Sequence, residues 1–146
     1  MKCLNCDNEK FETKKINTAV EYAGEKFEAI VASYVCTKCR EQLMDSGQMN
    51  ALRQVAADEY RSKHGLLTSH QIVELRKRLG MSQREFASYL EVGEASIKRW
   101  ETYYAQETAM DQHIRLKCDK SYAEQNAFDV GIRFHKSDEF SGNRTF

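Results

Sequence analysis

The 146-residue sequence has no proline, no net charge and no long hydrophobic run. Its 22 basic and 22 acidic side chains cancel, so the chain lacks the bulk electrostatic attraction with which most nucleic-acid binders hold their targets. No stretch of about 18 apolar residues occurs, which excludes an ordinary transmembrane helix. The first six residues, MKCLNC, contain no apolar signal core. We therefore expect a cytoplasmic protein with no membrane partner.

The remaining composition is typical of a folded protein. Hydrophobic residues make up 41% of the chain, and together with clear periodicities and the lack of proline they favour a globular fold over disorder. The length accommodates one compact domain or two small ones. Small domains have marginal cores and often need a metal, a disulfide or a partner.

Four of the five cysteines form two Cys-x-x-Cys pairs, Cys3 with Cys6 and Cys36 with Cys39, with 29 residues between the pairs. Four thiolates in two tight loops are what tetrahedral Zn²⁺ requires, and four protein ligands leave no open coordination position. We therefore expect a structural zinc ion. The alternatives are two redox dithiols or a rubredoxin-like iron site, but neither suits a hairpin whose thin core needs metal affinity to fold. Cys118 lies far from both pairs and is interpreted as an ordinary half-buried thiol.

The segment between the cysteine pairs has the pattern of a β-hairpin. The stretch KKINTAVEYAGEKFEAIVASYVC contains two extended runs joined at Ala23-Gly24. Period-two alternation in the second run places Phe27, Ala29, Val31, Ser33 and Val35 on one face, and Glu28, Ile30, Ala32 and Tyr34 on the other.

A helix that links two domains is predicted after the second cysteine pair. Asp45 with Gln48 has the pattern of a capping box, and His64-Gly65 marks the helix end. The residues at helical spacing are Met49, Leu52, Ala56 and Tyr60.

From Thr68 onward the sequence predicts several short helices. Thr68 with Gln71 and Ser82 with Glu85 are capping boxes that begin two of them, and Gly80 ends the first. Several short helices with one short turn in the middle indicate a helix-turn-helix domain. The residues expected to face its core are Ile72, Leu75, Leu79, Phe86, Tyr89, Leu90, Ile97 and Trp100. A further helical segment is marked by Met110, Ile114 and Leu116.

The helix that follows the turn at residues 91–93 carries two adjacent cations. In a helix-turn-helix this element lies in the major groove. There Arg99 could donate two hydrogen bonds to a guanine, a contact worth about 1–3 kcal/mol of discrimination, while Lys98 is expected to meet phosphate. Taken alone, the two cations would also fit a solvated helix face. The residues expected at the DNA are Gln83 and Arg84, at the start of the preceding helix, and Ala95, Ser96, Lys98 and Arg99.

The charge bias of the proposed DNA-binding part is weak. Residues 68–117 contain 8 basic and 7 acidic side chains, against 10 and 10 in residues 1–67. So small an excess of positive charge predicts weak non-specific binding to DNA. We therefore expect a homodimer on a palindromic operator in double-stranded DNA.

The C-terminal extension contains one strand-like run. In AFDVGIRFH, apolar and polar residues alternate strictly, which predicts a strand over residues 127–135. Since an isolated strand is not stable in water, it would have to pair with the zinc-bearing sheet, with its copy in a dimer, or with a different protein.

The order Cys-x-x-Cys, hairpin, Cys-x-x-Cys, helix and then ELRKRLGMSQREFASYLEVGEASIKRWE resembles the MqsA antitoxins, which join a YgiT-type zinc finger to an Xre-type helix-turn-helix. The likeness covers residues 1 to about 117. With the patterns above it implies an α+β chain of two small domains. Its parts are a zinc ribbon-like hairpin domain at 1–44, a linking helix at 45–67, an all-α, lambda-repressor-like helix-turn-helix at 68–117 and an extension at 118–146.

The resemblance also implies a function. In that family the zinc domain binds and neutralises a ribonuclease toxin, and the C-terminal domain dimerises and represses the operon that encodes both proteins. The residues that match by motif are Cys3, Cys6, Cys36 and Cys39 as zinc ligands, Gln83 as the helix-opening glutamine and Arg99 as the base-reading arginine.

The chain departs from the family pattern at three places. Ala95 stands where the archetypal antitoxin has an asparagine, so the preferred operator should differ. Glu91 stands where many Xre turns have glycine, at a cost of about 1 kcal/mol if the backbone there is left-handed. The strand-like tail has no counterpart in the archetype.

Two other classes of function remain open from the sequence. One is a stand-alone Xre-family regulator, of phage origin, whose zinc ribbon serves dimerisation or binds another protein; an adjacent ribonuclease-like reading frame would separate it from an antitoxin. The other is an enzyme with Cys118 as nucleophile and His113 as base, for which no triad context is recognisable. The remaining histidines, at 64, 70 and 135, have no partner spacing.

Overall fold

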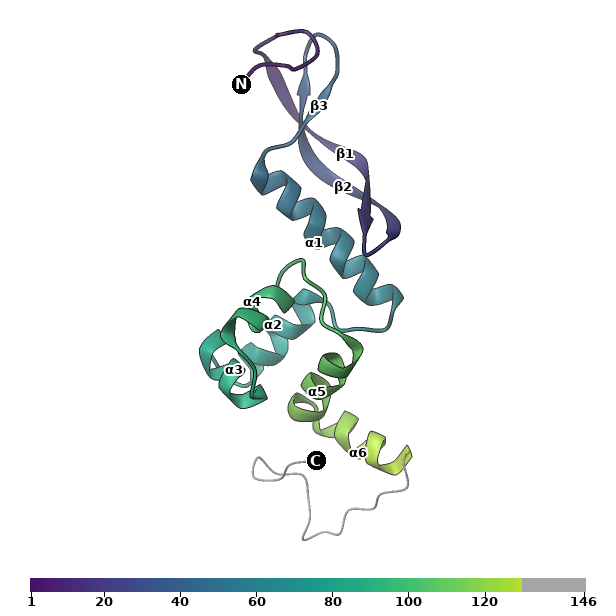
Figure 1. Cartoon of the computed structure of the whole chain (residues 1–146), viewed down its shortest axis with the longest axis vertical. Coiled ribbons are helices and arrows are strands. Elements are labelled where there is room, and N and C mark those ends of the chain that lie inside the picture. Colours follow the sequence, from purple (N-terminus) through teal and green to yellow (C-terminus); the bar gives the residue numbers. More distant parts are fainter. Residues whose placement is uncertain (130–146) are drawn as a thin grey trace.

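The computed structural model describes residues 1–129 as an α+β chain. Within this range a three-stranded antiparallel sheet of order β1-β2-β3 precedes six helices. The molecule is elongated: the N-terminal loops lie at one end, α1 runs alongside the hairpin, and α2 to α6 lie at the other end (Figure 1). None of the helices among these residues is both long and apolar enough to span a bilayer. The elements are β1 Phe11–Tyr22, β2 Glu25–Cys36, β3 Gln42–Leu43, α1 Ser46–Lys63, α2 Ser69–Arg78, α3 Gln83–Leu90, α4 Glu94–Trp100, α5 Thr108–Cys118 and α6 Lys120–Asp129.

The predicted hairpin is confirmed, and its strands pair over their whole length. The register runs from Phe11 opposite Cys36 to Tyr22 opposite Glu25. The two turn residues, Ala23 and Gly24, have φ angles of 50° and 78°. Two successive positive φ angles are typical of the two-residue turn that matches the twist of antiparallel strands.

One face of the sheet packs against α1. Ala29, Val31 and Leu52 form a small core cluster, with Val20 and Met44 packed at its edge. The opposite face is open, and Ile30 is 70% exposed. The alternation predicted for β2 is therefore confirmed, although Phe27 at the strand's start is only half-buried.

Helix α1 begins at the predicted capping box and ends at the predicted residues. The Asp45 carboxylate accepts from the Gln48 backbone, and the Gln48 side chain accepts from the Asp45 backbone. Of the residues at helical spacing, Leu52 and Ala56 are buried, whereas Met49 is 42% exposed. It lies in the first turn of the helix, and Leu52, one turn later, makes the contact with the sheet.

Helices α2 to α5 enclose a second core. The predicted inward positions are largely confirmed, but Leu79 is 40% exposed and its placement was wrong. Leu79 is the C-cap of α2, where the chain turns through Gly80 at a φ of 68°, so helical spacing no longer applies there. Leu116 is half-buried and lies outside this cluster. The core consists of Leu67, Ile72, Phe86, Ala87, Leu90, Ile97, Trp100 and Ile114.

The C-terminal extension begins as a helix. Helix α6 covers Lys120–Asp129, so the predicted strand is wrong at residues 127–129, and residues 130–135 lie outside the described part of the chain. Asp119 breaks the path between α5 and α6, and its carboxylate accepts from the backbone of Tyr122. A helix satisfies its own backbone hydrogen bonds, whereas a strand here would need a partner.

Candidate metal centre and nucleic-acid interface

The structure brings the four paired cysteines together at the end of the sheet. Cys3 and Cys6 lie in the loop before β1, Cys36 ends β2, and Cys39 lies in the turn that follows. Their sulfur atoms all lie within 4.8 Å of one another, with 3.4 Å between Cys3 and Cys39 and 3.6 Å between Cys6 and Cys36. Metal–sulfur bonds of about 2.3 Å in a tetrahedron place the sulfurs about 3.8 Å apart. The cluster therefore fits one tetrahedral metal ion.

Two similar loops present these sulfurs. The backbone of Asp7 donates to the carbonyl of Cys3 at 2.9 Å, and the backbone of Arg40 donates to the carbonyl of Cys36 at 3.0 Å. Asp7 and Arg40 have φ angles of 61° and 67°, a left-handed conformation that costs a non-glycine residue about 1 kcal/mol or more. Both loops hold this conformation, so something must offset its cost, and metal binding is the stabilising interaction that the site can supply.

The thiols of the cluster differ in their pKa values. Burial opposes the charge of Cys36, but the backbone N–H of Cys39 and the side chain of Asn8 outweigh it and lower the pKa of Cys36 to about 6. At Cys6 a backbone bond from Asn8 favours the thiolate, yet burial and the three neighbouring sulfurs raise its pKa to about 12. Four thiolates this close together would repel one another, and a cation between them would stabilise their charged forms.

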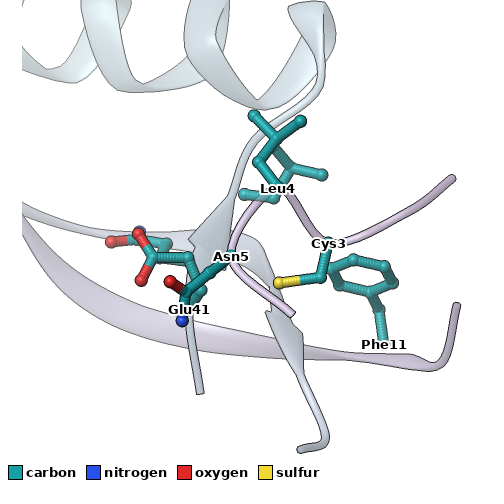
Figure 2. A pocket seen from close by; sticks show the side chains of 7 residues that line it. Cys3, Leu4, Asn5, Phe11 and Glu41 are labelled. Atoms are coloured by element: carbon teal, nitrogen blue, oxygen red, sulfur yellow. The ribbon is translucent and has the colours of Figure 1, made fainter. Parts of the chain in front are cut away.

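A small pocket lies beside the cluster, at the edge of the sheet (Figure 2). Leu4, between the first two cysteines, is 91% exposed at its rim. The residues that line the pocket are Cys3, Leu4, Asn5, Phe11, Glu41, Gln42 and Leu43.

Helix α4 presents the predicted polar residues away from the core. Ile97 and Trp100 are buried, as expected. Lys98 and Arg99 are exposed, and the Lys98 ammonium lies 4.0 Å from the carboxylate of Glu94. Among the described residues, the Arg99 side chain forms no ion pair. On the same exposed side, Ala95 is open to solvent and Ser96 is half-buried.

The turn before α4 has the geometry anticipated from its sequence. Glu91 has φ 60° and ψ 41°, so a left-handed residue stands where glycine would be unstrained. The Val92 backbone donates to the carbonyl of Ala87 at 3.0 Å, and the Glu91 backbone donates to that of Ser88 at 3.2 Å. These bonds close the C-terminus of α3 and set the direction in which α4 starts.

Gln83 and Arg84 both lie in the first turn of α3, as predicted, but they point to different surroundings. Arg84 is exposed, whereas Gln83 is half-buried and donates to Glu101 at 3.2 Å. Glu101 is also held by Arg76 of α2 through bonds of 2.8 and 3.0 Å, and Arg76 donates to the carbonyl of Met81. Sequence reasoning missed this pair, because Arg76 is one of three consecutive basic residues with nothing local to distinguish it.

Arg61 of α1 and Tyr22 of β1 were also missed. Arg61 is fully buried beneath the end of α4, and the Tyr22 hydroxyl contacts the segment after α4. Apart from Asp58, three residues before Arg61, their hydrogen-bond partners lie more than 35 residues away in sequence, so no local signal could have identified these contacts.

Within residues 1–129, the surroundings of Cys118 and His113 do not favour a nucleophile–base pair. Burial raises the pKa of Cys118 to about 12, the opposite of what a nucleophilic thiol needs. The His113 ring bonds to the carbonyl of Leu90, and the His64 ring to Glu25. His70 lies 3.6 Å from Glu74 on an exposed face, and His135 lies outside the described residues.

A known protein family matches most of the chain. The family model described as the antitoxin component of bacterial toxin-antitoxin systems, MqsA, matches residues 1–118. A search of curated proteins found no match. The matched range contains the cysteine cluster, the sheet and helices α1 to α5. The chain therefore belongs to the MqsA family of antitoxins.

Proposed function

We propose that this chain binds and neutralises a ribonuclease toxin and, as a homodimer, represses its own operon through α3, the turn and α4. The proposal rests on the orientation of α4 in a chain that belongs to an antitoxin family. Its apolar side is buried in the helical core while Arg99 is exposed on the outer side. The protein acts by binding alone, without catalysis.

Zinc is the metal that suits the cysteine cluster. Four thiolates at tetrahedral spacing favour Zn²⁺ or an iron centre, and the closed ligand set leaves no position for a substrate. The role of the ion is to hold two loops that have almost no apolar core of their own. Cys3, Cys6, Cys36 and Cys39 would be its ligands.

In this proposal α4 enters the major groove. Arg99 would reach a guanine edge with both arms of its guanidinium, and Lys98 would meet phosphate. Ala95 and Ser96, near the helix start, would face the bases. At the start of α3, Arg84 would meet phosphate, and Gln83 would help to place the two helices while it donates to Glu101.

Dimerisation compensates for the weak charge of the chain. With equal numbers of basic and acidic residues, one copy offers little general attraction for a polyanion. Two copies on a palindromic operator double the specific contacts without adding net charge.

The toxin is expected to engage the zinc-binding half. This assignment rests on the family, and the pocket beside Cys3, with the exposed Leu4 at its rim, is a surface there that a partner could cover.

Co-expression with the neighbouring gene tests the proposal. We expect the two products to co-purify, the metal content to be one zinc per chain, and the purified antitoxin to protect part of the promoter upstream of the pair in a footprint. A protein that protects the promoter but has no toxin neighbour would instead be a stand-alone regulator. A purified protein that binds neither the neighbouring gene product nor the promoter would contradict the proposal.

A further inference from the structure

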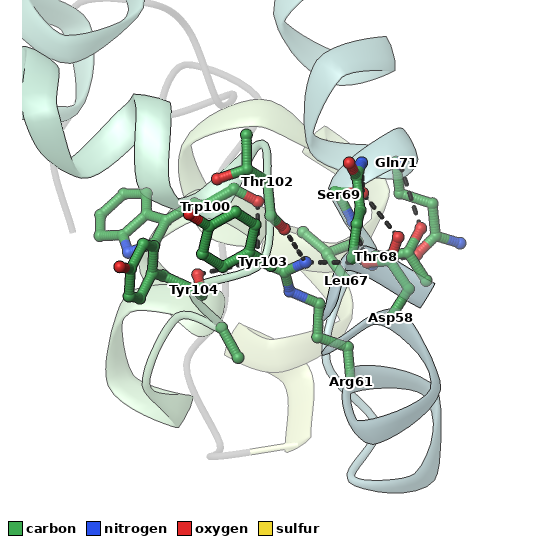
Figure 3. A network of polar contacts seen from close by, with 12 residues as sticks. Asp58, Arg61, Leu67, Thr68, Ser69, Gln71, Trp100, Thr102, Tyr103 and Tyr104 are labelled. Carbon is green, nitrogen blue, oxygen red and sulfur yellow. Dashed lines mark hydrogen bonds and ion pairs between the residues drawn. The ribbon is translucent and has the colours of Figure 1, made fainter. Parts of the chain in front are cut away.

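Arg61, near the end of α1, is fully buried and uses all five of its N–H groups. Most of their acceptors belong to residues 100–106, the segment that leaves α4 (Figure 3). Nε donates to the side-chain oxygen of Gln106 at 3.0 Å. Nη1 donates to the Asp58 carboxylate at 2.8 Å and to the Thr102 carbonyl at 2.7 Å. Nη2 donates to the carbonyls of Trp100 at 2.8 Å and Tyr104 at 2.9 Å.

This arginine meets α4 at its C-terminal end. Trp100 is the last residue of α4, and its carbonyl is among the groups that a helix end leaves without an intrahelical partner. A cation at this position also meets the negative end of the helix dipole. Helix α4 has only seven residues, far too few to be stable alone in water. Its placement therefore depends on tertiary contacts: Ile97 and Trp100 pack in the core, and Arg61 holds its C-terminal end.

The same segment is held by the tip of the hairpin. The Tyr22 hydroxyl donates to the carbonyl of Tyr103 at 2.8 Å and accepts from the backbone of Ala105 at 2.9 Å. The Tyr22 ring also lies 5.4 Å from that of Tyr60 on α1. The half of the chain that contains the cysteine cluster thus contacts the backbone immediately after α4 at two independent points, through Arg61 and through Tyr22.

Asp58 extends the connection to α2. Its carboxylate accepts from Arg61 and from both the backbone and the hydroxyl of Ser69, at 2.8 and 2.6 Å. Ser69 is the first residue of α2. Helix α1 is therefore attached to the first and the last elements of the α2–α4 unit, and is more than a flexible linker.

We infer that Arg61 and Tyr22 are positioning residues for DNA recognition: they fix the end of α4 and make operator reading depend on the contact with α1 and the hairpin. The inference rests on the proposed function, because it assigns a role in how α4 meets DNA. Under this inference, a movement of the hairpin also changes the position of α4, because both contact residues 100–106.

A purely structural role has a different signature. A variant that only lowers stability reduces the folded fraction and weakens binding to every DNA sequence alike. A variant that misplaces α4 weakens base contacts and leaves phosphate contacts largely in place. The ratio of affinities for promoter and scrambled DNA therefore separates the two roles.

The test compares Arg61→Lys and Tyr22→Phe in the full-length protein. Arg61→Lys keeps the charge but cannot reproduce five donors, and Tyr22→Phe removes only the hydroxyl. The probes are a duplex spanning the promoter upstream of this chain's own gene and a scrambled duplex of equal length. Because Trp100 is the single tryptophan, its emission reports on the end of α4 directly.

Two control variants match these changes. Tyr34→Phe removes a hydroxyl from the same hairpin that donates to Asp45, away from α4. Ile72→Val removes a buried methylene from α2 and lowers stability, while it leaves every hydrogen bond from Arg61 and Tyr22 to residues 100–106 in place. All variants are compared at a temperature at which circular dichroism shows that they are folded.

We expect the promoter-to-scrambled ratio to fall about tenfold or more for Arg61→Lys and about three- to tenfold for Tyr22→Phe, given the usual strength of charged and neutral hydrogen bonds. Trp100 emission should shift in both variants, and the controls should keep the wild-type ratio. If Arg61→Lys does not fold, Tyr22→Phe alone decides. A wild-type ratio in Tyr22→Phe or in folded Arg61→Lys would overturn the inference, whereas a wild-type protein without promoter preference would instead refute the proposed repressor function.

Discussion

Arg76 and Glu101 form a two-pronged ion pair between the end of α2 and the residue that follows α4. Their side chains are only 15% and 5% exposed, so water screens the pair little. Since Glu101 also accepts from Gln83 at the start of α3, one carboxylate connects three helices. The proposed reading unit is thereby held together by polar contacts as well as by its core.

Glu101→Gln should destabilise the helical half of the protein by about 3 kcal/mol, because it leaves the Arg76 guanidinium buried beside a neutral amide. Urea denaturation followed by Trp100 fluorescence measures the change. Glu94→Gln is the matched control, since Glu94 lies 4.0 Å from Lys98 and both side chains are well exposed. Equal shifts of the midpoint in the two variants would show that the pair does not stabilise the fold.

Arg99→Ala should reduce discrimination between promoter and scrambled DNA by about 1–3 kcal/mol while the thermal midpoint stays nearly unchanged. The side chain is exposed and makes no ion pair among the described residues, so its removal costs the fold little. Arg84→Ala is the companion variant and should weaken both duplexes to a similar degree. Gel shifts with Arg99→Ala that retain the full preference for the promoter would rule out a base-reading role.

Cys36→Ser should lower the bound metal well below one ion per chain and unfold mainly residues 1–40, because three thiolates and a hydroxyl make a poor site for zinc. Metal analysis and circular dichroism give the result. Cys118→Ser is the control, since Cys118 lies on α5, outside the cluster, and its loss should leave the metal content unchanged. Full occupancy in Cys36→Ser would remove Cys36 from the ligand set.

Glu85 links the stability of α3 to pH. The backbone N–H and then the hydroxyl of Ser82 hold the pKa of Glu85 below its ordinary value of 4.5. A lowered pKa in the folded state means that the contribution is complete above the unfolded value and is lost as the pH falls through the folded value. Glu85→Gln should therefore be less stable than wild type at pH 7, and this difference should vanish in acid.

Urea midpoints between neutral pH and about pH 3 test this dependence, since that interval spans ordinary carboxyl pKa values. Glu107→Gln serves as the comparison, because Glu107 begins α5 but its side chain makes no capping bond. A wild-type advantage over Glu85→Gln that persists unchanged in acid would contradict the assignment.

The hairpin turn and the capping boxes could be predicted because their causes are local. Each capping box joins residues three apart, such as Ser82 and Glu85, and the turn needs only two residues that accept a positive φ angle. The cysteine cluster was also accessible, since its ligands come from two short motifs whose spacing already limits the possible metal.

The tail shows where such reasoning reaches its limit. Alternation over residues 127–135 satisfies the pattern of a strand, yet α6 extends to Asp129. A short segment can form a strand only where the edge of a β-sheet is available to pair with it. The sequence of the segment does not show whether such an edge lies nearby.

The amino-acid sequence by itself determined the starts of α1, α2 and α3, the hairpin, the cysteine cluster and the exposed face of α4, because these follow from contacts within a few residues, from periodicity or from the spacing of short motifs. Only the tertiary structure decided that Arg61, Tyr22 and the Arg76–Glu101 pair hold α4 in place. The contacts that these residues make to residues 100–106 join positions 25 to 83 apart, and a buried arginine and an exposed one look alike until the chain folds around one of them.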